Sequence, residues 1–211
     1  MRSADRLSMT NQTATDSVTR LVISHGDLPG LVAAMIASEE TVRRESLGRG
    51  RPVVWSGSSL GRTAAERQAK SLGLGVATRR GAPETGGHTG EAATRLLIDA
   101  ATAALRLACP IVVWPIVPAG PASSEPAIVE LIADAVNRAT LASRLVSLDA
   151  PAAGIPEVRI ETPFVDLTDE QLADLACDVG VRFEDCWWWS NDSSAASTER
   201  ARWAPLLPIS A

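Results

Sequence analysis

The sequence has few of the features that disulfide-rich, metal-knuckle and membrane proteins need. It contains three cysteines, with no Cys-x-x-Cys pair among them, so we expect neither a disulfide framework nor a zinc knuckle. No apolar run reaches the roughly 18 residues that a membrane-spanning helix needs. The N-terminus also lacks the basic-then-apolar layout of a signal peptide. We therefore expect no membrane partner and a cytoplasmic location.

Charge and length limit the function further. The 211 residues carry a net charge of −5 without a cluster of basic residues, which argues against a nucleic-acid partner. A chain of this length fits one domain. The polar, aperiodic segment 1–19 is expected to be a disordered tail. Residues 20–192 are expected to form the domain, followed by a C-terminal tail over 193–211.

Short apolar runs alternate with helical patterns along the chain. We expect strands at 21–24, 53–55, around Val76, at 111–114 and at 158–160, and helices at 31–37, 61–72, 91–108, from 124 and after Thr168. Continuous apolar runs of this length are typical of buried parallel strands. The alternation predicts an α/β domain with a parallel sheet and helices on both faces.

Local signals refine several of these elements. Thr168 and Gln171 have the spacing of a capping box, and Gly73 has the position of a glycine that ends a helix. Cys109 and Cys177 are interpreted as core residues. The helix that begins near residue 124 is expected to have one apolar face, formed by residues 128, 129, 132, 135 and 136.

The segment after the first expected strand, Ser24-His-Gly-Asp-Leu-Pro-Gly30, is a candidate binding loop. Ligands of open parallel sheets bind at the carboxyl ends of the strands, and a helix N-terminus there offers N–H groups to a phosphate. Two interpretations of the whole segment stay open, and ion-pair or proton chemistry by His25 is a further candidate role. The segment is a reshaped phosphate site, or an ordinary turn with Asp27 as the helix cap and Pro29 as a helix-start residue. In the first, the nucleotide-binding residues are Ser24, His25, Gly26, Asp27 and Gly30.

A later segment carries a family resemblance. The stretch from Arg159 to Trp187 contains Thr162-Pro163, Asp166 and Phe183-Glu184. It closely resembles the C-terminal signature of the 7-cyano-7-deazaguanine synthases, which belong to the ATP-pyrophosphatase (PP-loop) superfamily. The resemblance extends over roughly residues 20–192. It implies a Rossmann-like (HUP-type) fold, in which a twisted parallel sheet of about five strands has helices on both faces and the first strand near its centre.

The resemblance also implies a chemistry. Synthases of this family use ATP with Mg²⁺, and ammonia, to convert 7-carboxy-7-deazaguanine into the 7-cyano base on the route to queuosine. The carboxylate is activated as an acyl adenylate and AMP is released; the synthases commonly form homodimers. In this chain Ser24 and Gly26 match the family's Ser-Gly-Gly-x-Asp-Ser loop, whereas His25 replaces a glycine and Pro29 replaces the second serine.

The C-terminal segment departs from the family pattern at the zinc site. Aligning Phe183-Glu184 places Trp187 and Asn191 on the family's Trp and Asn, but puts Trp189 on the first zinc cysteine. We therefore expect no zinc. The Trp187–Trp189 segment is interpreted as a hydrophobic plug that replaces the zinc, a stacking wall for a planar heterocycle, or an exposed patch for a protein partner. If it is a wall, the substrate-binding residues are Trp187, Trp189 and Asn191.

Alternative functions remain open from the sequence. In the first, the chain is a divergent synthase-like protein that uses ATP to activate the carboxylate of a 7-deazapurine or of another compound. In the second, it is an intact synthase whose binding sites are built from other residues. Alternatively, it is a catalytically inactive paralogue that binds a nucleotide or a protein partner. No catalytic residue is assigned, because no Ser-His-Asp order, metal-ligand helix or acid–base pair is recognisable.

Overall fold

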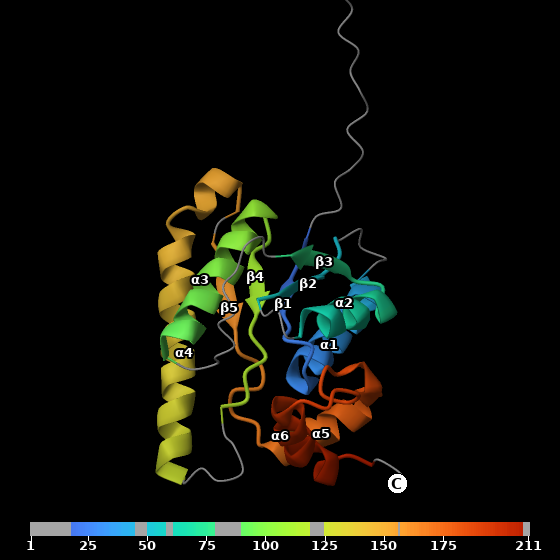
Figure 1. Cartoon of the computed structure of the whole chain (residues 1–211). Coiled ribbons are helices and arrows are strands. Elements are labelled where there is room, and N and C mark those ends of the chain that lie inside the picture. The colour runs from blue at the N-terminus through green and yellow to red at the C-terminus, as the bar shows by residue number, and fades with distance from the viewer. Residues whose placement is uncertain are drawn as a thin grey trace, which may run out of the picture.

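Five short parallel strands form the centre of the molecule (Figure 1). The computed structural model describes residues 18–44, 50–57, 61–78, 90–118, 125–155 and 157–208. The strands are β1 (Leu21–Ile23), β2 (Val53–Ser56), β3 (Gly75–Thr78), β4 (Ile111–Val113) and β5 (Arg159–Glu161). Neighbours pair in parallel in the order β3-β2-β1-β4-β5. This is the Rossmann-like arrangement predicted from the sequence, with β1 in the middle.

Six α-helices lie around this sheet in the described part of the chain. They are α1 (Leu28–Arg44), α2 (Arg62–Ser71), α3 (Gly90–Arg106), α4 (Glu125–Ser147), α5 (Asp169–Asp178) and α6 (Ser194–Trp203), with 3₁₀ turns η2 (Ala150–Ala153), η3 (Phe183–Asp185) and η4 (Ala204–Leu206). Figure 1 shows α3 and α4 on one side of the sheet, and α1 and α2 on the other. No helix in the described ranges is long and apolar enough to cross a membrane.

Side chains along β1 alternate between two core layers. Val22 belongs to the layer formed with α1, α2, α5 and α6, whereas Leu21 and Ile23 belong to the layer formed with α3 and α4. All three side chains are fully buried. A strand covered on both faces needs apolar residues at every position, which explains the unbroken apolar run in the sequence.

Two local predictions are confirmed at helix ends. Thr168 caps α5 through a capping box: its hydroxyl accepts a hydrogen bond from the Gln171 N–H (3.2 Å), and Gln171 Oε1 accepts one from the Thr168 N–H (2.9 Å). Gly73 follows α2 in the left-handed conformation, with φ of 67°, and its N–H donates to the carbonyl of Lys70. These signals place the ends of both helices correctly.

One of the two core cysteines was predicted wrongly. Cys109 is buried as expected, but Cys177 is exposed. In α5 the residues that face the core are Leu172, Ala173 and Ala176. Cys177 is one residue beyond Ala176, and each helical residue turns by about 100°, so its side chain points to solvent.

The predicted apolar face of α4 is also partly wrong. Val129 and Val136 are 62% and 40% exposed. The helix is buried instead through Ala135, Ala139, Ala142 and Val146. Mostly small side chains on this face let the helix backbone approach α3 and β5, with which it makes contact. The larger apolar residues consequently lie on the outer face.

Both ends of the domain are attached to its body. Residues 1–17 of the predicted tail lie outside the described residues, whereas Thr19 is tied to the chain before β2 by hydrogen bonds to the carbonyls of Gly50 and Arg51. At the other end, residues 193–208 contain α6 and η4. Ala196 and Trp203 are fully buried, so this segment packs as a short helix in the core.

The capping box gives a first test of these assignments. Replacing Thr168 with Ala removes the side-chain acceptor for the Gln171 N–H, and we expect the free energy of unfolding to fall by about 1 kcal/mol. Thr198→Ala is the control, because the exposed Thr198 hydroxyl only donates to the carbonyl of Ser194 within α6; we expect a change below about 0.5 kcal/mol. Urea denaturation of both variants measures the difference. Equal losses would contradict the capping role.

Candidate functional site

The loop after β1 lies where the strand order reverses. β1 pairs with β2 on one side and with β4 on the other. The chain leaves β1 through α1 toward β2, and later enters β4 from α3. The loops that follow β1 and β4 therefore diverge, and the crevice between them is the usual ligand site of an open α/β sheet.

Ser24 is fully buried at the start of this loop. Its hydroxyl donates to Gln68 Oε1 (3.2 Å) and accepts a hydrogen bond from the Gly26 N–H (3.0 Å). The Gln68 amide in turn donates to the carbonyl of Asp185 (3.2 Å). Ser24 thus ties the loop to α2 and to η3. The Ser24 hydroxyl therefore donates one hydrogen bond and accepts another within the protein.

Gly26 and Gly61 allow the loop to lie directly against the start of α2. Gly26 has φ of 71°, and a Cβ there would lie 2.5 Å from the carbonyl oxygen of Gly61 and 2.6 Å from Ala64 Cβ. A Cβ on Gly61 would overlap the carbonyl of His25. The glycine at position 26 therefore serves contact between two backbone segments, in a conformation that favours glycine.

The N-terminus of α1 is capped from within the chain. Asp27 Oδ1 accepts a hydrogen bond from the Gly30 N–H (3.2 Å), and Pro29 has no N–H to offer. The cap starts the helix at Leu28, three residues before the expected start. The sequence alternative of Asp27 as cap and Pro29 as helix-start residue is thus confirmed. The Asp27 carboxylate occupies the place where a helix N-terminus stabilises an anion.

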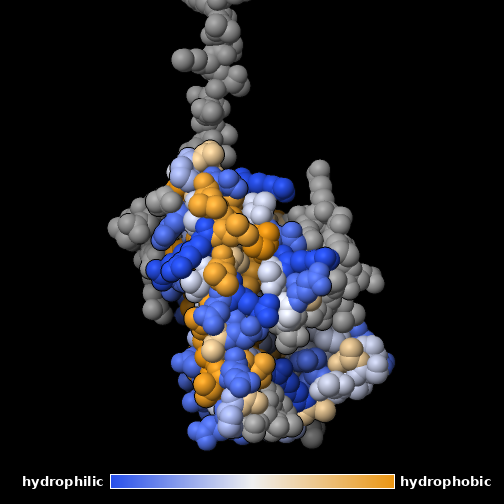
Figure 2. All heavy atoms as spheres, turned by 90° about the vertical axis from the view of Figure 1, so that its left-hand side faces the viewer, coloured by the Kyte–Doolittle hydropathy of each residue, from blue (hydrophilic) through white to orange (hydrophobic). Residues whose placement is uncertain are grey.

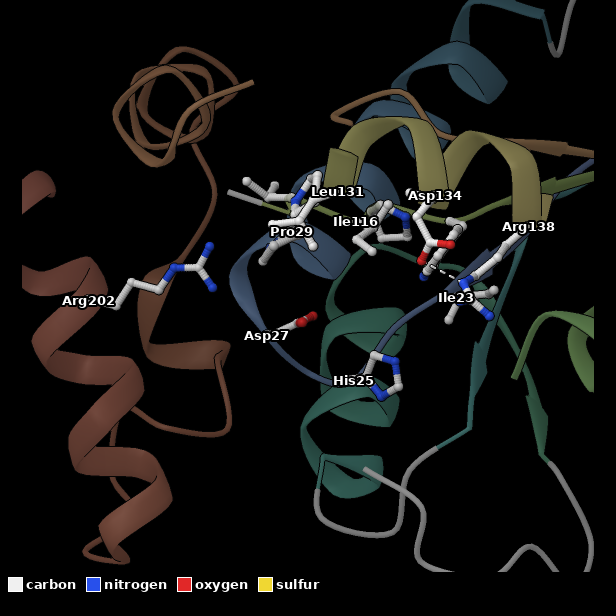
Figure 3. A pocket seen from close by; sticks show the side chains of 14 residues that line it. Ile23, His25, Asp27, Pro29, Ile116, Leu131, Asp134, Arg138 and Arg202 are labelled. Atoms are coloured by element: carbon white, nitrogen blue, oxygen red, sulfur yellow. Dashed lines mark hydrogen bonds and ion pairs between the residues drawn. The ribbon is translucent and has the colours of Figure 1, made fainter. Parts of the chain in front are cut away.

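A cavity of about 160 Å³ lies beside this loop. Figure 3 shows side chains from four regions around it: the β1 loop, the segment after β4, α4 and α6. The lining residues are Ile23, His25, Asp27, Pro29, Trp114, Pro115, Ile116, Val117, Pro118, Leu131, Asp134, Ala135, Arg138 and Arg202. Most of these side chains are apolar, so the cavity has hydrophobic walls and a few polar groups, as ligand pockets usually do.

Both arginines of the cavity already pair with carboxylates. Arg138 donates from Nε to Asp134 Oδ2 (2.7 Å), and its Nη1 donates to the carbonyl of Gly90 and the hydroxyl of Thr94. Arg202 forms a bidentate pair with Asp169, at 2.8 and 2.6 Å. A carboxylate thus already balances the charge of each guanidinium group.

The charge balance around the cavity does not favour a polyanion. Burial by itself lowers the pKa of Arg202, but the hydrogen bonds and negative charge of Asp169 outweigh it, and Glu199 and Asp27 add to the effect, so the pKa is raised. Three carboxylates, of Asp27, Asp134 and Asp169, therefore accompany the two guanidinium groups of Arg138 and Arg202. Asp169 lies outside the cavity lining and pairs with Arg202, so carboxylates balance both guanidinium charges.

The tryptophan segment lies next to the loop but outside the cavity. The Trp187 N–H donates to the carbonyl of Gly26 (2.8 Å), which joins the two predicted sites through their backbones. Trp188 is fully buried, as the plug interpretation requires of at least part of the segment, while Trp187 and Trp189 are half-buried. The residues that line the cavity do not include Trp187, Trp189 or Asn191. Their proposed role in substrate binding stays a prediction.

Arg200 holds the backbone that follows the tryptophans. Its Nη2 lies within hydrogen-bonding distance of the carbonyls of Trp188 (2.9 Å), Trp189 (3.2 Å) and Asn191 (2.8 Å). Asn191 Oδ1 also accepts the N–H of Ser193 (2.9 Å). A single guanidinium thus orders the turn from Trp188 to Asn191. This role has no local sequence signal, because it depends on contacts between α6 and the turn.

The structure brings the predicted loop residues together with residues that sequence analysis did not select. His25 and Asp27 line the cavity, whereas Ser24, Gly26 and Gly30 shape the loop behind them. Trp114, Arg138 and Arg202 were missed. Arg138 had one local signal, its spacing of four residues from Asp134 on a helix. Arg202 and Asp169 are far apart in the sequence, so no local pattern could have paired them.

Metal and thiol chemistry finds little support in the described residues. Within the described ranges, no group of three or more His, Cys, Asp or Glu side chains could hold a metal ion; His88 lies outside them. Burial raises the pKa of the Cys109 thiol to about 11. Burial, with the nearby carboxylates of Asp27 and Asp185, also raises the pKa of Cys186 well above its usual value. Neither thiol is poised to act as a nucleophile at neutral pH.

Comparison with known proteins does not assign a family. No family model matches the chain, and no curated protein matches it. The fold is Rossmann-like on the evidence of its strand order, while the resemblance to the 7-cyano-7-deazaguanine synthases stays an interpretation of the sequence.

The contact between the loop and α2 can be tested with two glycine variants. Gly26 and Gly73 have nearly the same φ, 71° and 67°, but a Cβ on Gly73 would meet nothing within 4 Å. Gly73→Ala therefore measures backbone strain alone, about 1 kcal/mol. Gly26→Ala adds overlap with α2, and we expect its free energy of unfolding to fall by at least about 2 kcal/mol more. Equal destabilisation in urea titrations would show that the close contact is absent.

Proposed function

We propose that this chain binds a small planar heterocycle of the purine or 7-deazapurine class in the crevice between β1 and β4. It acts as a binding domain and does not hold the phosphates of ATP at the N-terminus of α1. The observation that carries this proposal is the combination of an apolar cavity at the switch point with a helix N-terminus already capped by Asp27.

The size of the cavity supports a ring-sized ligand. Its volume is about 160 Å³. Apolar cavities of roughly 150 Å³ accept benzene, whereas sites for drug-sized ligands begin at about 300 Å³. The cavity therefore fits one heterocyclic ring system or part of it. The remainder of a larger ligand would extend outside.

The chemistry of the walls supports a heterocycle with polar edges. Trp114, Ile116 and Leu131 offer apolar surface to the ring faces. His25 and Asp27 offer polar groups to the ring edge, and a carboxylate accepts hydrogen bonds through both of its oxygens. A guanine-type base presents adjacent N–H donors on one edge, which is the complement of a carboxylate. The family resemblance points to the same class of base.

An ATP-dependent reaction is the second candidate. The Rossmann-like strand order, the position of the loop after β1 and the resemblance to the synthases support it. In this form the chain activates a carboxylate with Mg-ATP and releases AMP. The paired arginines and the Asp27 cap favour the binding domain over it, because carboxylates of the chain already balance the guanidinium charges and the positive end of the α1 dipole.

Calorimetric titration distinguishes these functions. The ligands are 7-carboxy-7-deazaguanine, adenosine and Mg-ATP, each titrated into the full chain. We expect saturable heat with at least one of the two ring compounds. We also expect Mg-ATP to bind no more tightly than adenosine, because its phosphates find no site of their own. Mg-ATP binding at least about tenfold tighter than adenosine, with AMP formed in the presence of the carboxylate base, would favour the synthase-like reaction.

A matched pair of variants locates the binding. Ala135 and Ala139 are both 3% exposed and lie one turn apart on α4, but only Ala135 lines the cavity. Leucine at either position adds similar volume to the core and costs roughly 1–3 kcal/mol of stability. We expect Ala135→Leu to abolish ligand binding and Ala139→Leu to keep it. Absence of heat with all three ligands, or equal binding by both variants, would overturn the proposed site.

A further inference from the structure

The two outer strands of the sheet differ in what lies beside their free edges. β3 pairs only with β2, and β5 pairs only with β4. On its other side, each strand presents N–H and C=O groups that find no partner within the sheet. Such an edge is a template for pairing with another chain unless the protein covers it. The hydrogen bonds of the two edges therefore show where a further strand can be added.

The edge of β5 is closed by α4. The Arg159 N–H donates toward the β4 side, so Val158 and Ile160 point away from the sheet. The Ser147 hydroxyl accepts the Val158 N–H (3.0 Å) and donates to the Val158 carbonyl (3.1 Å), and the Ser143 hydroxyl accepts the Ile160 N–H (2.9 Å). Figure 2 views the molecule from the side of α4, which covers this end of the sheet. This edge is thus occupied by the chain itself.

The register of β2 shows which groups of β3 point outward. The Val53 N–H donates to the carbonyl of Arg20 (2.9 Å), so Val53 faces β1. Alternate residues of a strand face opposite neighbours, so Val54 faces β3, where its partner in the register is Val76. In a parallel pair, a residue bonds to the two residues that flank its partner, and the partner points the other way. The N–H and C=O of Val76 therefore point away from the sheet.

This edge of β3 is open in the described part of the chain. No described residue forms a hydrogen bond with the outward N–H and C=O of Val76, or with the N–H of Thr78, which points the same way. The Val76 side chain is 44% exposed on the α2 side of the edge. On the other side Ala77 is partly buried, and a Cβ on Gly75 would lie 2.8 Å from Val53 Cγ1. Apolar side chains therefore flank the open edge on both faces.

We propose that the edge of β3 is a docking site for an extended segment of a partner protein, which adds a strand beside β3. The outward groups recur at every second residue, and an extended backbone presents complementary donors and acceptors at that spacing. The valine surface on both faces of the edge suits a segment with apolar side chains that alternate between the faces. β1 and β2 separate this edge from the cavity, so the site does not depend on the proposed heterocycle.

Amide hydrogen exchange of the full chain, followed by nuclear magnetic resonance, tests whether the edge is open. After correction for intrinsic rates, we expect the Val76 amide to exchange at least about tenfold faster than the Ile160 amide, because only the latter donates a hydrogen bond within the chain. The Ala77 amide belongs to the ladder with β2 and should exchange slowly. A Val76 amide as protected as that of Ile160 would show that the chain already covers the edge, and would overturn the proposal.

A library of displayed random peptides of about seven residues, a usual strand length, supplies the probe for docking. The most enriched sequence is synthesised and titrated into the full chain. Methylation of its backbone nitrogens, one at a time, should weaken binding at least about tenfold at alternate positions only, because every second N–H of an added strand faces β3. No enriched sequence, or losses without this alternation, would count against a docked strand.

Val76→Pro is the matching change in the protein. It removes the N–H that points outward and leaves the bonds to β2 in place, and proline is tolerated at such edge positions. We expect it to weaken peptide binding at least about tenfold, whereas the control Val76→Thr keeps the N–H and should bind as the wild type does. Equal binding by both variants would overturn the proposal. Self-association of the free chain that Val76→Pro abolishes would assign the edge to a second copy instead, and would equally overturn it.

Discussion

The contact between the Gly26 backbone and the first turn of α2 determines the form of the candidate site. Because Gly26 and Gly61 have no side chains, the loop after β1 lies against α2, and the Ser24 hydroxyl reaches Gln68. The loop is then held in one conformation, in which Asp27 caps α1. The positions of His25 and Asp27 at the cavity follow from this contact.

The internal cap changes what a familiar fold can bind. In many Rossmann-like proteins the N-terminus of the helix after β1 holds a phosphate, but here a carboxylate of the chain stabilises that end of the helix. The arginines near the cavity likewise pair with Asp134 and Asp169. Binding at the switch point is therefore left to apolar contacts and to a few hydrogen-bonding groups, which is the basis of the proposed heterocycle site.

Much of the fold could be predicted because its signals are local. Apolar runs marked the strands, and the spacing of Thr168 and Gln171 marked the start of α5. The outer face of α4 could not be predicted in this way, because its exposure depends on how closely α3 and β5 pack. Three alanines and Val146 face them, whereas Val129 and Val136 do not. The same limit applied to the site. Asp27 as a cap was readable from the sequence, whereas the Arg202–Asp169 pair forms only in three dimensions.

The most direct test of the internal cap is a nuclear magnetic resonance titration with magnesium pyrophosphate, observed at the backbone amides of Leu28 and Gly30. These N–H groups belong to the first turn of α1. Asp27 already accepts the Gly30 N–H, and its negative charge directly before Leu28 disfavours an anion at this helix end, so the account predicts that neither signal moves at millimolar ligand. A saturable shift of both signals would show that the helix N-terminus binds phosphate, and would contradict the central claim.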